Sequence, residues 1–215
     1  THRSLANSAN AYKQYRDTCT VNQFQARVVF VDEIYDEFGY GTITPLAIKR
    51  FCKYAIENWS TPPKYVFLWG KGQYETRNHP GNLVPAYGYP ASDYEYVSDY
   101  DPFVPDIVPV VPIGRVNVFN DTEGYVYLNK INQYEHTPWD PWMKRSVFMG
   151  GGENVVEQGA ILGYLQRYRA AMEKAPNGGL GYYWQKYNTG ITSNGGQFSG
   201  PTEVIDKGTG IIHFF

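Results

Sequence analysis

Three consecutive glycines, Gly150–Gly152, precede two acidic residues, Glu153 and Glu157. Glycines between a strand and a helix leave backbone amides that can hold an anion at the helix N-terminus. The string GGGENV lacks the third glycine of a dinucleotide fingerprint, so an ordinary turn is the favoured interpretation. Gly70–Gly72 lacks the rest of a Walker motif and is interpreted in the same way. The two glutamates suit either an active-site rim or a favourable interaction with the helix dipole, and both interpretations stay open.

The only two cysteines, Cys19 and Cys52, are the first residues to consider as nucleophiles. Cys52 falls on the apolar face of a predicted helix, where a free cysteine behaves as a small hydrophobic residue. Cys19 has no histidine nearby in the sequence. No pair of histidines has metal-ligand spacing. The four histidines are His2, His79, His136 and His213. We therefore expect neither cysteine to be catalytic. We also expect that the chain binds no organic cofactor.

Acidic residues gather in one loop-rich stretch. They are Asp93, Glu95, Asp99, Asp101 and Asp106. Loop carboxylates together with backbone carbonyls are the ligands that calcium prefers, although the spacing is not that of an EF-hand. A solvated acidic loop is the alternative to a calcium site, and composition alone does not decide between them.

The elements that must position these residues alternate between strand and helix. The run 27–31 is apolar on both faces, which predicts a central parallel strand. Thr44 and Pro45 begin a helix that should end near Trp59, with a second buried strand at 64–70. Residues 71–106 are rich in Gly, Pro, Tyr and Asp, which indicates loops and a hairpin around 87–100.

The second half continues the alternation. Predicted strands are 107–116, 146–149, 180–187 and 210–215, and predicted helices are 121–136, 155–174 and 201–207. Segment 107–116 contains Pro109 and Pro112, so it should be an irregular or edge strand. Alternating strands and helices predict a three-layer α/β/α fold with a mostly parallel sheet, flavodoxin-like, plus the hairpin.

Composition excludes some classes of function. A net charge of −2 and a pI near 6.1 argue against a nucleic-acid-binding protein, which usually has a basic patch. No apolar run approaches the roughly 18 residues that span a bilayer, so no membrane span is expected. The 20 tyrosines, with plentiful Asn and Gly, are typical of secreted or cell-surface proteins.

Several strings occur together in a familiar order. They are Asp32–Gly41, Pro45–Phe51, Lys64–Gly70, Val84–Tyr87, Ser92–Asp93, Asp106 with Ile113–Arg115, and Asn129–Glu135. In this order they resemble the amino-terminal half of the catalytic domain of gingipain-like cysteine peptidases, including the sortase-like peptidases of type IX secretion. The resemblance covers nearly all of residues 10–215.

The resemblance implies two adjacent α/β subdomains with a caspase-like architecture, and proteolysis by a Cys–His dyad in the second. Residues 1–23 would be a lead-in segment, and 24–215 the amino-terminal subdomain, truncated before the catalytic subdomain is complete. The pattern of Gly208–Phe215 predicts a turn followed by a buried strand. Because Gly210–Phe215 resembles the family's strand before the catalytic Gly-His pair, we expect the dyad beyond Phe215 and an inactive fragment. His213, Cys19 and Cys52 would not inherit catalytic roles.

The resemblance also implies roles for particular residues. Asp106 matches an acidic residue of a calcium-binding loop, although a second acidic ligand would fall near Val110. Glu153 matches a carboxylate that supports the catalytic histidine or one that selects a basic substrate residue. The family's usual Gly-Asp is here Gly70–Lys71, which reverses the charge of that loop.

The partners expected are a protein or peptide substrate and the carboxyl-terminal subdomain of the same polypeptide. One alternative from another class is a non-catalytic module with a Tyr-rich surface that recognises protein or glycan. A second is a nucleotide-binding α/β protein, which depends on Gly150–Gly152 alone.

Overall fold

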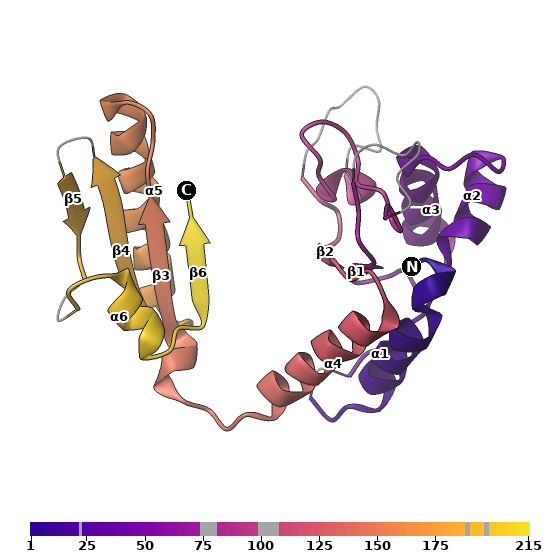
Figure 1. Cartoon of the computed structure of the whole chain (residues 1–215), viewed down its shortest axis with the longest axis horizontal. Helices are drawn as coiled ribbons and strands as arrows, with labels where there is room; N and C mark the ends of the chain where they lie inside the picture. The colour runs from indigo at the N-terminus through magenta and orange to yellow at the C-terminus, as the bar shows by residue number, and fades with distance from the viewer. Residues whose placement is uncertain (22, 74–80, 99–107, 188–189, 196–197) are drawn as a thin grey trace. The chain divides into compact units, whose positions relative to one another are not determined.

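The computed structural model describes residues 1–215 except 22, 74–80, 99–107, 188–189 and 196–197. The chain forms two compact units, unit 1 (Thr1–His136) and unit 2 (Thr137–Phe215), and each is described by itself. Figure 1 shows α-helices and strands in both. The predicted boundary between 1–23 and 24–215 depends on the family resemblance, and it stays a prediction.

Unit 1 is a small parallel sheet with helices on both of its faces. Its elements in chain order are η1 (Arg3–Leu5), α1 (Ala6–Thr18), α2 (Val31–Gly39), α3 (Pro45–Asn58), β1 (Val66–Trp69), η2 (Tyr94–Val97), β2 (Ile113–Val116) and α4 (Asp121–His136). Strand β1 pairs with β2 in parallel, and Val66 lies opposite Ile113. Successive residues of β1 point to opposite faces, so Leu68 joins a cluster with α2 and α3, and Trp69 joins a cluster with η1 and α1.

The predicted helix that begins at Thr44 and Pro45 is confirmed as α3. The Thr44 hydroxyl accepts a hydrogen bond from the Leu46 amide at 3.3 Å, and Pro45 occupies the first helical turn. Cys52 lies on the buried face of this helix, as predicted, together with Ala47, Ile48 and Ala55. This face lies in the hydrophobic cluster that packs on β1.

Several predictions for unit 1 need correction. Residues 27–30 form no strand, and Val31 begins α2. A cavity lies between this segment and β1, and no strand of the described residues pairs with the segment. In the described part of 87–100, the predicted hairpin is reduced to one bridge between Tyr87 and Ser92, followed by η2. In the described part of 107–116, the strand is confined to the residues after Pro112, which has no N–H to donate.

Unit 2 is a four-stranded sheet between helices. Its elements are η3 (Pro141–Lys144), β3 (Arg145–Gly150), α5 (Val155–Glu173), β4 (Leu180–Tyr187), β5 (Gly190–Ser193), α6 (Pro201–Asp206) and β6 (Ile211–Phe214). The strand order is β5-β4-β3-β6, and β3 is parallel to both β4 and β6, whereas β5 is antiparallel to β4. Leu165 of α5 and Val204 of α6 belong to separate clusters that pack on alternate residues of β3. The predicted α/β fold with a mostly parallel sheet is confirmed.

The final strand forms as predicted, but the prediction that it is buried is wrong. Strand β6 lies at the edge of the sheet, and its side chains are exposed, with 75% of Phe214 accessible. An apolar strand is buried only where other elements cover both of its faces, and that coverage is not encoded in the strand's own pattern. Strand β5, a short exposed strand, was not predicted.

Candidate functional site

The carboxyl end of β3 carries the glycine turn and the two glutamates. This strand lies between β4 and β6, so its end opens at the same sheet edge as theirs. The Gly151 amide donates a hydrogen bond to the Phe215 carbonyl at 3.1 Å, which extends the ladder past β3. Loops at the carboxyl ends of parallel strands are where α/β proteins place their functional groups.

Glycine is required at two positions of this turn. A Cβ on Gly150 would clash with the Gln185 side-chain oxygen and would lie 2.6 Å from Ile161 Cγ2. Gly152 has a φ of +123°, a conformation that residues with a side chain rarely adopt. These constraints agree with the interpretation of the glycines as a tight turn.

Two buried glutamine side chains hold the turn. Gln185 Nε2 donates to the Gly151 carbonyl at 2.7 Å, and Gln158 Nε2 donates to the Gly152 carbonyl at 2.9 Å. Their side chains are 0% and 2% exposed. Because buried polar groups are costly unless hydrogen-bonded, these amides restrain the backbone strongly. Sequence analysis missed both glutamines, although Gln185 interrupts an aromatic strand and so gave a usable signal.

The structure separates the roles of the two glutamates. Glu157 Oε2 accepts a hydrogen bond from the Glu153 amide at 2.7 Å, and Asn154 Oδ1 accepts one from the Glu157 amide at 3.0 Å. Together they cap the N-terminus of α5. Glu157 therefore has the structural role that we considered for both. Within the described part of the chain, the Glu153 side chain is exposed and has no hydrogen-bond partner, so its carboxylate remains accessible.

This difference predicts unequal effects on stability. Replacing Glu157 with alanine removes the acceptor for the Glu153 amide and should lower the free energy of unfolding by about 1 kcal/mol, a typical value for a lost cap. Replacing Glu153 with alanine should leave the stability unchanged. Urea unfolding of the two variants measures the difference, and equal losses of stability would contradict the assignment.

The cysteines and histidines of the chain do not form a nucleophile–base pair in the described residues. Cys52 is only 3% exposed in the core of unit 1, and burial raises the pKa of its thiol to about 12. Since the thiolate is the nucleophile, Cys52 is inert at neutral pH. Cys19 is also buried. His213 lies in β6 and stacks on Phe148 with ring centroids 5.4 Å apart.

The other histidines are also accounted for. His2 accepts a hydrogen bond from the Ser4 amide at its Nδ1, and His136 Nδ1 lies 2.9 Å from the Asn132 carbonyl oxygen. His79 lies outside the described residues. The prediction that none of these residues is catalytic stays a prediction.

Two members of the acidic cluster have basic partners. Asp93 forms a two-point ion pair with Arg115, at 2.7 and 2.8 Å, and Glu95 lies 3.6 Å from the ammonium of Lys49. Asp99, Asp101 and Asp106 lie outside the described residues. Val110, where a second ligand was expected, is apolar and exposed. The described residues contain no group of three or more His, Cys, Asp or Glu that could hold a metal.

Arg115 connects the loops at the carboxyl end of the unit 1 sheet. Besides Asp93, its guanidinium donates to the carbonyls of Gly70 at 2.8 Å, Val84 at 2.6 Å and Pro85 at 3.1 Å. Its side chain is 13% exposed. Lys71 is linked to this network through Val84. The Lys71 carbonyl accepts a hydrogen bond from the Val84 amide at 3.0 Å, and the Val84 carbonyl accepts one from Arg115. A single side chain therefore holds the loops around this end of the sheet.

Comparison with known proteins gives one match. A family model described as peptidase family C25 matches residues 1–215. No curated protein and no solved structure matches significantly. None of the helices in the described part of the chain has the length and hydropathy needed to cross a bilayer.

Proposed function

Because the chain belongs to peptidase family C25, the gingipain family of cysteine peptidases, we propose that it is the amino-terminal part of a cysteine endopeptidase. The observation that carries this proposal is the family match over all 215 residues. The Cys–His dyad lies outside residues 1–215 in this proposal. The inert environment of Cys52 supports that placement.

In the intact enzyme, histidine accepts the proton of the cysteine thiol, and the thiolate attacks the carbonyl carbon of the scissile peptide bond. The C–N bond breaks, the histidine protonates the departing amine, and an acyl-enzyme remains. Water or an amine then attacks this thioester, which gives hydrolysis or transpeptidation and restores the thiol. Residues 1–215 contribute the substrate rim and its support, and we expect no hydrolysis by them alone.

Glu153 is the residue of this chain that we assign to the site. Its accessible carboxylate, at the end of the central strand β3, supports either of two roles. Beside the catalytic imidazole, it would stabilise the imidazolium that forms during acylation. Facing the substrate, it would pair with a lysine or arginine side chain.

A thiol-directed peptidyl inhibitor tests the proposal. We expect no labelling of residues 1–215, and labelling of a polypeptide that continues about 100 residues past Phe215, enough to supply a nucleophile and its base. Labelling or hydrolysis by residues 1–215 that Cys52→Ser abolishes would overturn the placement of the dyad. Labelling of neither folded polypeptide would overturn the peptidase proposal.

The two roles of Glu153 separate in the extended enzyme. If Glu153 supports the histidine, Glu153→Gln should lower kcat for basic and neutral peptides alike. If it selects basic residues, only peptides with lysine or arginine should lose kcat/KM. Glu157→Gln is the matched control, since its carboxylate caps α5.

Calcium, secretion and membership of a type IX secretion pathway remain proposals. Calcium binding would depend on Asp106 and its neighbours, and a rise in melting temperature on adding CaCl₂ alone would support it. The location would be the cell surface or the medium.

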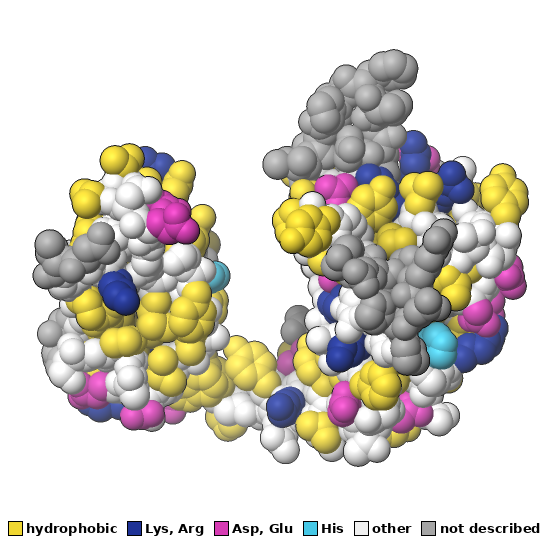
Figure 2. Space-filling model, turned by 45° about the horizontal axis from the view of Figure 1, so that its top comes forward, with side chains coloured by type: hydrophobic (Ala, Val, Ile, Leu, Met, Phe, Trp, Pro, Cys, Tyr) yellow, Lys and Arg dark blue, Asp and Glu magenta, His cyan; other side chains and the backbone are white. Residues whose placement is uncertain are grey.

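A recognition module is the second candidate function. Exposed tyrosines favour it, and the most exposed are Tyr40 at 90% and Tyr89 at 85%. Figure 2, whose key colours tyrosine as hydrophobic, shows hydrophobic side chains among charged ones on the visible face of both units. Failure of the extended polypeptide to react with the inhibitor would favour this candidate.

A further inference from the structure

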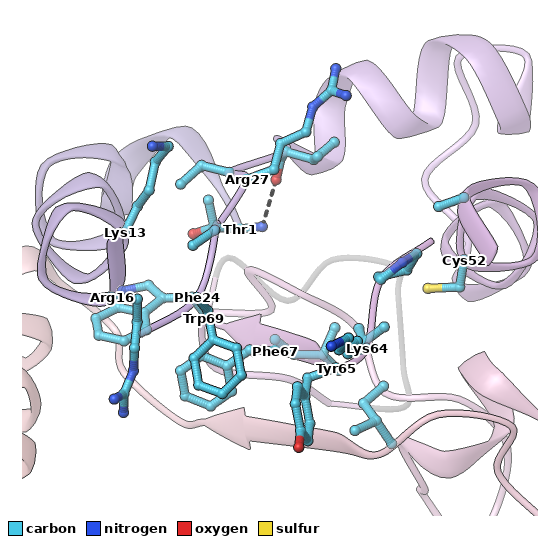
Figure 3. A pocket seen from close by; sticks show the side chains of 18 of the residues that line it. Thr1, Lys13, Arg16, Phe24, Arg27, Cys52, Lys64, Tyr65, Phe67 and Trp69 are labelled. Carbon is cyan, nitrogen blue, oxygen red and sulfur yellow. Dashed lines mark hydrogen bonds between the residues drawn. The ribbon is translucent and has the colours of Figure 1, made fainter. Parts of the chain in front are cut away.

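A slot of about 1500 Å³ runs through unit 1 beside β1. One long side is the edge of β1 from Tyr65 to Trp69, and the other is the segment 23–29. Figure 3 shows Thr1, Phe24, Phe67 and Trp69 around this space. A space of this size with a largely apolar lining is unusual, since protein interiors are closely packed.

Helices line the slot on both faces. Ala9 and Tyr12 come from α1, and Ile48, Phe51 and Cys52 come from α3. In a three-layer fold, this is the environment of a parallel strand, which has helices above and below and a strand on each side. The slot therefore has the surroundings of a strand that is missing from the sheet.

The edge of β1 that faces the slot pairs with no strand of the described residues. The Val66 amide donates to Pro112 and the Gly70 amide donates to Val116, both at 3.0 Å, so these residues face β2. Because the backbone groups of successive residues point to opposite sides of a strand, those of Phe67 and Trp69 face the slot. An open edge of this kind is a template for a further strand.

Thr1 already makes the first bonds of such a strand. Its nitrogen donates to the Val29 carbonyl at 2.9 Å, and its carbonyl accepts from the Val31 amide at 2.8 Å. Thr1 is thus hydrogen-bonded to the residues on either side of Phe30, and this is the hydrogen-bond pattern of two parallel strands. The direction of that ladder places the residue before Thr1 in the slot, beside the residues that precede Val29.

The α-amine of Thr1 is poorly suited to its surroundings as a charged group. Burial, and to a smaller extent the charge of Arg115, lower its pKa to about 5. A neutral peptide N–H at the same place would make the same hydrogen bond to Val29 without a desolvated charge.

We propose that the slot holds an extended segment of this polypeptide directly preceding Thr1, paired in parallel with residues 25–29 on one side and with β1 on the other. The segment has about five residues, to match 25–29, and it is apolar at nearly every position because helices cover both faces. It would convert the β1–β2 pair into a four-stranded parallel sheet. The proposal is independent of peptidase activity.

The first test compares three forms of the chain: residues 1–215, the same chain with its natural upstream residues, and the same chain with a Gly/Ser stretch of equal length. Amide exchange of Phe67, Trp69 and Val28 is the measurement. We expect the natural extension alone to slow it, by at least about tenfold, and to raise the melting temperature by about 4 °C or more. Equal exchange in the natural and Gly/Ser forms would overturn the proposal, and so would natural upstream residues that are polar.

The pH dependence of stability gives a second readout. In residues 1–215 the unfolded amine, with a pKa near 8, binds a proton that the folded amine does not bind until about pH 5. Stability should therefore fall as the pH falls from 8 to 5. Both extended forms should lack this fall in stability between pH 8 and pH 5, because neither has an α-amine at Thr1. Only the natural extension should slow the amide exchange of β1. Slow exchange of Phe67 in residues 1–215 themselves would mean that segment 25–29 closes the slot, and would contradict the proposal.

Discussion

Replacing Arg115 with leucine should lower the free energy of unfolding of unit 1 by about 2–3 kcal/mol, less than the roughly 3–5 kcal/mol for a fully buried ion pair, because the Arg115 and Asp93 side chains are 13% and 24% exposed. The guanidinium is 13% exposed and joins Asp93 to three backbone carbonyls. Without it, the Asp93 carboxylate and the carbonyls of Gly70 and Val84 lose its hydrogen bonds, whereas the Pro85 carbonyl still accepts from the Tyr96 hydroxyl. The loss of stability is measured by urea unfolding, with amide exchange in peptides from Thr1–His136 as the signal for unit 1.

Two further variants make this prediction specific. Arg3→Leu removes an ion pair with Asp32 and Glu33 whose side chains are about half exposed, and it should change the stability little. The double variant Arg115→Leu with Asp93→Leu should recover part of the loss, since no uncompensated charge remains. A loss of equal size for Arg3→Leu and Arg115→Leu would show that burial of the Arg115 pair is unimportant.

Replacing Gly150 with alanine should destabilise unit 2 by about 1–3 kcal/mol, the range for overpacking of a core. The added methyl would meet the Gln185 side-chain oxygen and would lie 3.0 Å from Leu165 Cδ1. Gln185 would then have to move, and with it the hydrogen bond to Gly151 that fixes the turn before Glu153. Urea unfolding measures the stability, and amide exchange of 151–157 reports on the turn.

Gly159→Ala is the matched control for Gly150→Ala. Gly159 lies within α5, and nothing lies within 4 Å of an added Cβ. Alanine should therefore stabilise the helix by up to about 1 kcal/mol, which reverses the sign of the effect. A destabilised Gly159→Ala, or an unperturbed Gly150→Ala, would show that the packing of the turn is not as described.

Much of the fold could be predicted from local pattern. The N-cap at Thr44, the apolar spacing through Cys52 and the aromatic strand at 180–187 each depend on residues close in sequence. Periodicity reports which side of an element is buried, and it does not report what covers that side. For this reason 27–30 and β6, both apolar, were predicted as buried strands, and the first forms no strand while the second is exposed.

The candidate site was predicted only in part. Its position after β3 followed from the order of strand, glycine turn and helix, and Glu153 with Glu157 could be named without the structure. Their different roles could not be predicted, because they depend on which carboxylate accepts the hydrogen bond from the Glu153 amide. The contribution of Gln185 was hidden as well, since it depends on the register that places Gln185 opposite Gly150.

The sequence by itself determined the alternation of strand and helix, the glycine turn, the buried place of Cys52 and the family resemblance, since motif order and spacing lie within the chain. Only the tertiary structure decided which groups meet. Arg115 and Gly70 are 45 residues apart, and Gln185 and Gly151 are 34 apart. Such contacts are set by strand pairing and helix packing, and those depend on the whole chain folding together rather than on any one segment.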